Sequence, residues 1–180
     1  MDADTYPMNR RRFLMASGLV AATAVTGITW RRATMPAPAV ADIMVELQAM
    51  RTHTISTLSG WSAYTVFSHL AQSIELSMTG YPRLKSPVFR HTAGPTAFFV
   101  FTTAGAMRHP LTEPIPGAPA IAESGDVQVA LERLLAALAT FAAHEGELAP
   151  HFAYGQLSKD EYAQAHTMHI RDHLRLFAPA

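Results

Sequence analysis

The sequence contains no cysteine, and only 16% of its residues are charged. Without a thiol, the chain cannot form a disulfide, a zinc-thiolate centre, a thiolate nucleophile or a lipid-modified cysteine anchor. Five of the 14 basic and two of the 14 acidic residues lie at positions 1–39, so residues 40–180 carry a net charge of −3. Because no basic run remains in that part, neither nucleic acid nor an anionic membrane surface is an expected partner.

The chain also lacks the sequence signatures of several enzyme classes. It has no serine nucleophile elbow, no phosphate-binding loop, no paired-carboxylate motif and no internal repeat. With 180 residues, of which 49% are hydrophobic, it is long enough for one soluble domain with a substantial core. Nine histidines remain as the side chains best suited to metal or acid-base chemistry.

The first 39 residues have the order of an export signal. Three arginines at positions 10–12 precede a mildly apolar run from Ala16 to Trp30, and small residues follow near position 40. The letters R-R-R-F-L at positions 10–14 resemble the twin-arginine signal R-R-x-F-L. The apolar run, about 15 residues long, is too short and too weakly apolar to span a membrane well. We therefore predict a signal peptide at residues 1–39 and a globular domain at residues 40–180.

A twin-arginine signal predicts a location and a partner. The partner is the twin-arginine export machinery, which carries proteins that have already folded and often already hold a cofactor. The expected location is the periplasm or another extracytoplasmic space. Arg31 and Arg32 directly follow the apolar run and disfavour efficient cleavage, and a chain that keeps its signal would stay tethered to the membrane.

Helical periodicity divides the predicted domain into four main helices. Apolar residues recur at helical spacing over residues 40–58, which predicts the first helix. The second is expected from a Ser62 cap to about residue 79. The segment T-A-F-F-V-F-T-T-A-G, residues 96–105, is expected as a short buried helix. Residues 108–125 are expected as a long loop of the kind that often borders a site.

The third and fourth helices have the clearest signals. Asp126 is placed to cap the third helix, whose apolar residues alternate in steps of four and three, like the seam of a bundle helix. The letters S-K-D-E at residues 158–161 form a capping box that starts the fourth helix, and its pattern continues to about residue 177. The expected fold is all-α, a four-helix bundle.

Three histidines lie on one face of the predicted fourth helix. The stretch H-T-M-H-I-R-D-H places His166, His169 and His173 in one stripe with Tyr162, beside an aliphatic stripe that has to face the core. Three charged imidazoles at the edge of a core would be costly to bury. A divalent ion bound by the neutral rings would resolve this conflict.

The spacing favours a metal site with ligands from two helices. His169 and His173 are four residues apart, so their rings lie on adjacent turns and can bind one ion. A third ligand has to come from another helix, and His69, among small and apolar residues of the second helix, is the best candidate. Three protein ligands would leave coordination positions for water or a small molecule, as catalytic metal sites require.

Single histidines and H-x-x-x-H pairs also occur without metal. A lone histidine such as His69 is more often a core or surface residue than a ligand, so the metal interpretation depends on several positions together. His151 is placed where it could line the mouth of the site. Four further histidines have no partner at useful spacing and are expected on the surface or in loops, namely His53, His91, His109 and His144.

Three stretches resemble an uncharacterised bacterial family within the DinB-like, YfiT-like superfamily of metal-dependent hydrolases. They are GWSAYTVFSHLAQSIELSMTGYP, PIPGAP and HFAYGQLSKDEYAQAHTMHIRDHL. The resemblance covers most of residues 42–177 and implies a four-helix bundle of DinB-like type that holds a nickel- or zinc-like divalent ion. The implied ligands are one histidine of the second helix and the H-x-x-x-H pair of the fourth, which match His69, His169 and His173. Many members have a histidine directly before the last ligand, where this chain has Asp172.

These observations predict a divalent-metal-binding protein with two classes of function. One is a metal-dependent hydrolase that activates a bound water against a small-molecule substrate, with His166, Tyr162 and Glu75 as candidates for moving protons. The other is a non-catalytic exported stress protein that binds metal or a small ligand. A metal-free helical interaction module, whose histidines titrate at about pH 6.5, is a third alternative. Since related bundles often dimerise, a homodimer is one assembly that the resemblance implies.

Overall fold

The computed structural model describes residues 40–58 and 60–177, and its regular structure there is helical. Apart from two isolated bridges, these residues form no β-structure. The elements are α2 (Val40–Ala49), the 3-10 turn η1 (Met50–Thr52), α3 (Ala63–Thr79), α4 (Pro87–His91), α5 (Ala93–Ala104), α6 (Val127–Ala143) and α7 (Lys159–Leu174). The predicted all-α class is confirmed. The predicted signal peptide lies outside the described residues.

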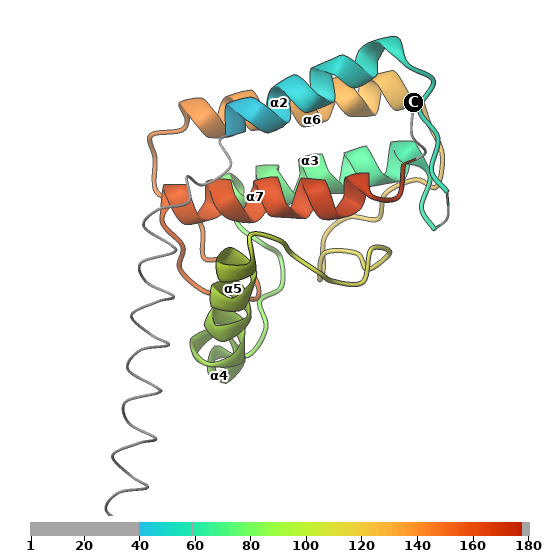
Figure 1. Cartoon of the computed structure of the whole chain (residues 1–180). Coiled ribbons are helices and arrows are strands. Elements are labelled where there is room, and N and C mark those ends of the chain that lie inside the picture. The colour runs from blue at the N-terminus through green and yellow to red at the C-terminus, as the bar shows by residue number, and fades with distance from the viewer. Residues whose placement is uncertain (1–39, 59, 178–180) are drawn as a thin grey trace, which may run out of the picture. The chain divides into compact units, whose positions relative to one another are not determined.

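Four helices enclose the hydrophobic core. Helix α3 packs along α6, α2 packs on α6 and α7, and α3 also contacts α7, so the contacts run around a closed ring (Figure 1). Each helix contributes fully buried large side chains to the shared core, among them Leu47, Phe67, Leu134 and Ile170. Within the described part of the chain, no helix is both long and apolar enough to cross a bilayer.

The caps predicted from the sequence define where three of these helices begin. Ser62 caps α3 by accepting the Thr65 N–H at 3.2 Å, and Asp126 caps α6 by accepting two backbone N–H groups. Ser158 and Glu161 form the reciprocal capping box of α7. Each cap satisfies donors that have no partner inside the helix, which stabilises a helix by about 1 kcal/mol. The caps therefore fix the starting register of both helices that carry the predicted ligands.

Two predicted helices are too long. The first ends at Ala49 and its 3-10 extension at Thr52, well before residue 58. Leu58 is 68% exposed, and its N–H donates to the carbonyl of Leu176 at 2.7 Å, just after α7. The intervening run of threonine, serine and isoleucine has weak helix propensity, so the apolar spacing that included Leu58 was coincidental. The fourth helix ends at Leu174 instead of residue 177.

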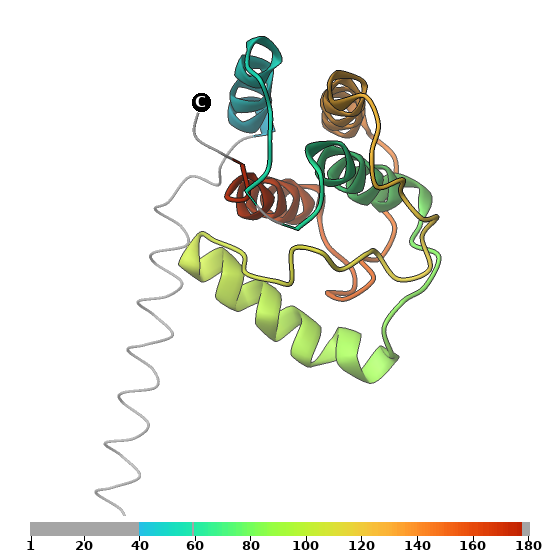
Figure 2. The ribbon, with the colours of Figure 1, turned by 90° about the vertical axis from the view of Figure 1, so that its right-hand side faces the viewer.

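The segment T-A-F-F-V-F-T-T-A-G is helical, as predicted, but it is not buried. It belongs to α5, in which only Gly94 and Phe98 are buried, while Phe99 is 39% and Val100 is 55% exposed. A Cβ on Gly94 would lie 1.9 Å from the carbonyl oxygen of Ala153, so a glycine is needed where α5 meets the loop before α7. The segment between α5 and α6 passes between α5 and the α3–α7 pair (Figure 2).

Candidate metal centre

Three histidines from α3 and α7 converge on one point. His69, His169 and His173 each offer a ring nitrogen, and these nitrogens all lie within 4.8 Å of one another. Their ring centres are 5.2 Å apart for His69 and His169, 5.1 Å for His69 and His173, and 4.9 Å for His169 and His173. With metal–nitrogen bonds of about 2.1 Å, two imidazoles that share one ion have ring centres roughly 5 Å apart. The cluster therefore has the dimensions of a metal site.

The buried rings lack hydrogen-bond partners that an ion would replace. His69 and His173 are 3% and 0% exposed. Both ring nitrogens of His173 and Nδ1 of His69 are buried and have no hydrogen-bond partner among the described residues. A buried polar atom without a partner costs about 1–3 kcal/mol. These orphaned nitrogens fit a bound cation better than an apolar packing role.

The three rings are neutral and so retain the lone pairs that a metal needs. Burial is the main cause, and it lowers the pKa of His69 to about 4 and that of His173 to about 3. Burial also lowers the pKa of His169 well below its ordinary value, and the neighbouring His173 adds to the effect. All three therefore remain unprotonated at neutral pH.

An aromatic side chain covers the cluster at the start of α3. The ring of Trp61 lies edge-on to His69 at 5.0 Å and stacks on His173 at 6.4 Å, with 8° between the two planes. Trp61 thus excludes water from one side of the two imidazoles. This contact strengthens electrostatic interactions within the cluster, because the local dielectric constant is low.

A fourth histidine, His109, lies in the loop after α5, and contrary to the expectation that it has no partner, its ring contacts the cluster. Its ring centre lies 4.8 Å from that of His169 and 5.1 Å from that of His173. Its Nδ1 lies 3.1 Å from the Asp172 carboxylate, which also accepts the His109 backbone N–H. Sequence reasoning missed His109 because the pair is 63 residues apart and a loop has no periodicity to align it. The one signal in the sequence was Asp172, which stands directly before the last predicted ligand, where many DinB-like proteins have a histidine.

The Asp172 carboxylate is buried and ionised. Its side chain is 1% exposed, and Arg108 and Arg175 both donate to Oδ1, at 2.8 and 2.7 Å. Burial alone would raise the pKa of Asp172, but the hydrogen bonds from Arg175 and Arg108 outweigh it and hold the pKa below its ordinary value. An ionised carboxylate only accepts hydrogen bonds, so His109 donates from Nδ1 and keeps its lone pair on Nε2.

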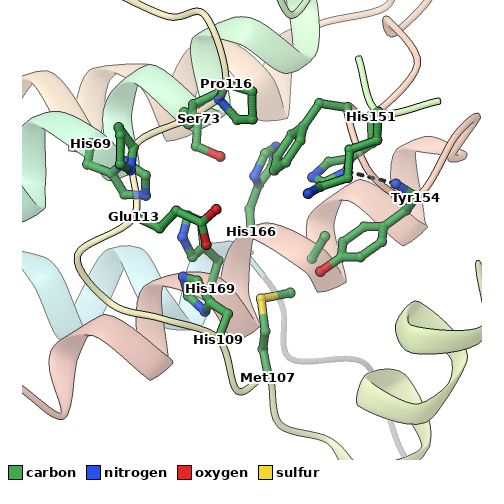
Figure 3. A pocket seen from close by; sticks show the side chains of 15 residues that line it. His69, Ser73, Met107, His109, Glu113, Pro116, His151, Tyr154, His166 and His169 are labelled. Carbon is green, nitrogen blue, oxygen red and sulfur yellow. Dashed lines mark hydrogen bonds between the residues drawn. The ribbon is translucent and has the colours of Figure 1, made fainter. Parts of the chain in front are cut away.

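A cavity of about 150 Å³ adjoins the histidine cluster. In Figure 3, His69, His169 and His109 lie at one end of it, and His151 and His166 lie toward the other. Apolar side chains, including Met107 and Ile115, supply much of the remaining wall. At this volume, the cavity beside the candidate metal site is large enough for a molecule about the size of benzene.

His151 and His166 give this cavity fixed hydrogen-bonding groups. Nδ1 of His151 accepts the backbone N–H groups of Ala153 and Tyr154, at 3.1 and 3.2 Å, so the ring proton is on Nε2. Nε2 of His166 lies 3.2 Å from Ser77 Oγ, whose own hydrogen is donated to a backbone carbonyl. His166 therefore donates from Nε2 and keeps a lone pair on Nδ1. Burial lowers the pKa of each ring to about 3, so both are neutral.

The structure brings only part of the predicted acid-base set to the cavity. His166 lines it, whereas Tyr162 is not among its lining residues and donates its hydroxyl to the Ala149 carbonyl at 2.7 Å. Burial raises the pKa of Tyr162. Glu75 also lies elsewhere and pairs with Arg133 at 2.6 Å. A different carboxylate, that of Glu113, points toward the space between the two histidine groups (Figure 3).

Comparison with known proteins identifies a family and no characterised relative. A family model described as "Protein of unknown function (DUF1569)" matches residues 30–180. No curated protein and no solved structure is significantly similar to the chain. The family match covers the whole described domain, including all residues of the histidine cluster.

Proposed function

Because the chain belongs to DUF1569, a family of unknown function, we argue from the site itself and propose a divalent-metal-binding protein that acts as a metal-dependent hydrolase. His69, His169 and His173 would hold the ion, with nickel and zinc as the metals that imidazole ligands suit. The observation that carries the proposal is the set of three neutral imidazoles with ring nitrogens within 4.8 Å of one another beside a cavity, two of which have buried nitrogens without a partner. The fold would be a four-helix bundle of DinB-like type.

The chemistry would take place at the boundary between the cluster and the cavity. A divalent ion with an open coordination position lowers the pKa of a bound water to about 7, which supplies a nucleophile near neutral pH. The Glu113 carboxylate points toward this space and can accept a proton there. Nε2 of His151 can donate to a substrate oxygen, and the lone pair on Nδ1 of His166 can accept from a substrate N–H or O–H.

The cavity favours a small, largely apolar substrate with few polar groups. Its volume of about 150 Å³ accommodates a fragment, and proline, methionine and aromatic side chains make up much of its wall. His151 and His166 are neutral and cannot attract an anion by charge, which leaves hydrogen bonding as their means of recognition. Lys85 is the cationic side chain among the lining residues and can contact an acidic group of a substrate.

A non-catalytic metal- or ligand-binding protein is the second candidate. The observation that favours it is that Glu113, the carboxylate among the lining residues, has no hydrogen bond to the described part of the chain that would hold it as a dedicated catalytic base. In this case the ion would crosslink α3 and α7 and stabilise the fold, and the cavity would bind a small molecule without changing it. A metal-free interaction module with titrating histidines is the third alternative.

Metal analysis and a substrate panel separate these three candidates. The full chain is expected to bind about one nickel or zinc ion, and a triple variant with alanine at His69, His169 and His173 is expected to bind none. His53→Gln is the matched control, because His53 is exposed and remote from the cluster in the sequence. Metal-dependent turnover of an ester, amide or lactone substrate would support the hydrolase. Binding without turnover would support the second candidate, and no binding by the full chain would leave the third.

Export is part of the same proposal. Arg10 and Arg11 would direct the folded, metal-loaded chain through the twin-arginine machinery to an extracytoplasmic space. Replacing both with lysine is expected to retain the protein in the cytoplasm, as measured by cell fractionation. Retention of the native chain in the cytoplasm would contradict the proposal. Size-exclusion chromatography with light scattering would test the homodimer that the DinB-like resemblance implies.

A further inference from the structure

We propose that His109 is a fourth protein ligand of the ion and that Asp172 is the residue that orients it. The inference rests on the proposed metal binding and extends it to the loop between α5 and α6. It adds one imidazole to the ligand set and links the site to a buried carboxylate. Sequence spacing assigned neither role, since His109 had no partner at useful spacing and was expected on the surface or in a loop, and Asp172 was a departure from the DinB-like pattern.

His109 lies as close to the H-x-x-x-H pair as His69 does. The His109 ring is as close to His169 and His173, at 4.8 and 5.1 Å, as His69 is, at 5.2 and 5.1 Å. The H-x-x-x-H pair of α7 therefore contacts one imidazole supplied by α3 and another supplied by the loop. Both separations are close to the roughly 5 Å expected for two rings on one ion. The nitrogens that lie within 4.8 Å of one another are those of His69, His169 and His173, so the His109 ring has to shift toward them for all four rings to bind one ion.

The two nitrogens of the His109 ring have different surroundings. Nδ1 is occupied by its hydrogen bond to the Asp172 carboxylate, and Nε2 is buried without a partner. The side chain is only 25% exposed, so solvent does not readily supply that partner. A ring with one nitrogen fixed by a carboxylate and the other left as an unused lone pair is the usual arrangement of a metal-binding histidine.

Asp172 also holds the loop that carries His109. Asp172 lies next to His173 in the sequence and accepts from both the ring and the backbone N–H of His109. Arg108 and Arg175 also donate to the same carboxylate. One buried side chain of α7 thus fixes two consecutive loop residues beside the H-x-x-x-H pair. This anchoring limits the ring orientations of His109 before an ion binds, which reduces the entropic cost of adding it to the ligand set.

A fourth imidazole has a consequence for the choice of metal. With four nitrogen ligands, a tetrahedral ion would have no open position for water or substrate. The proposed hydrolase then requires an ion that accepts five or six ligands, and nickel is more suited to this than zinc. A zinc-loaded protein with all four histidines bound would be expected to have low activity.

X-ray absorption spectroscopy on the metal-loaded full chain tests the inference directly, with zinc as the probe. The wild-type spectrum is expected to fit about four imidazoles per ion, that of His109→Gln three, and that of the control His53→Gln four. Competition with a chromophoric chelator is expected to show zinc affinity at least about tenfold lower for His109→Gln, and about 10- to 100-fold lower for Asp172→Asn. Circular dichroism of the chelated variants checks that each is folded.

The outcomes separate this inference from the proposed function. A wild-type protein that binds one zinc ion through three imidazoles, with His109→Gln unchanged in affinity, would overturn the role of His109 and leave the three-histidine site in place. A wild-type protein that binds no zinc would overturn the metal site itself, and the role of His109 with it. Since the imidazole count is measured on the wild-type protein, the test does not depend on the folding of any variant.

Discussion

Replacing His173 with leucine should have opposite effects on stability with and without metal. In the metal-free protein, His173 is 0% exposed and both of its ring nitrogens lack partners. Leucine fills a similar volume and has no polar atom to desolvate. Removing the orphaned groups relieves about 1–3 kcal/mol, and imperfect packing of the new side chain costs less than about 1.5 kcal/mol. We therefore expect His173→Leu to be about 1 kcal/mol more stable than the wild type in a chelator.

Bound metal should make the wild type more stable than His173→Leu. At a free metal concentration about 100-fold above the dissociation constant, binding stabilises the wild type by about 2.7 kcal/mol, whereas the variant has lost a ligand and gains little. The wild type should then be the more stable protein by roughly 1–2 kcal/mol. The assay is urea denaturation followed by far-UV circular dichroism, first with chelator and then with nickel or zinc.

Two results would refute this reasoning. In one, His173→Leu is clearly less stable than the wild type in chelator, which would mean that the ring nitrogens have partners or that packing against Trp61 dominates. In the other, metal stabilises variant and wild type equally, which would mean that His173 is not a ligand. His53→Leu is the control for a general effect of replacing histidine, since His53 is exposed.

Three further predictions concern pH, packing and capping. His151 and His166 have pKa values near 3 when folded, below the ordinary value of about 6.5, so the unfolded chain binds more protons as pH falls. When the pH falls from 7 to 5, each of these two histidines should lower the free energy of unfolding by about 2 kcal/mol. A free energy of unfolding that does not change with pH in urea denaturation would contradict this. Replacing glycine with alanine normally strengthens a helix, but Gly94→Ala should lower the melting temperature, because the new Cβ would lie 1.9 Å from the Ala153 carbonyl oxygen. An unchanged or higher melting temperature would disprove that contact. Ser158→Ala should cost about 1 kcal/mol in urea denaturation and should weaken metal affinity only slightly, whereas a complete loss of binding would show that the cap does more than start α7.

The sequence was sufficient for the parts of the fold that depend on local pattern. Capping residues and 3.6-residue periodicity located the starts of α3, α6 and α7, and the i, i+4 spacing paired His169 with His173. The same stripe also contained His166, but it lies apart from the metal cluster. His166 and His173 are separated by seven residues, which is roughly 10 Å along a helix, so the two rings cannot share one ion.

Contacts made by loops could not be predicted in the same way. The contact of His109 with Asp172 depends on how a long proline-rich segment crosses the domain, and no repeat in the sequence encodes that path. The exposure of α5 was missed for a related reason. Its composition is apolar, and only the packing of neighbouring elements decides how much of that surface is covered. Gly94 marks the close approach of α5 to the Ala153 carbonyl, which its sequence context does not reveal.

The ligand set has an uneven charge balance. Burial lowers the pKa of every imidazole in the cluster, so the rings are neutral, and the negative charge of Asp172 is already matched by Arg108 and Arg175. Two positive charges brought by an ion would therefore find only one further carboxylate nearby, that of Glu113, beneath a tryptophan that keeps water away. Such a centre would draw an anion from outside. Hydroxide, or a carboxylate or phosphate oxygen of a visiting molecule, would complete its electroneutrality.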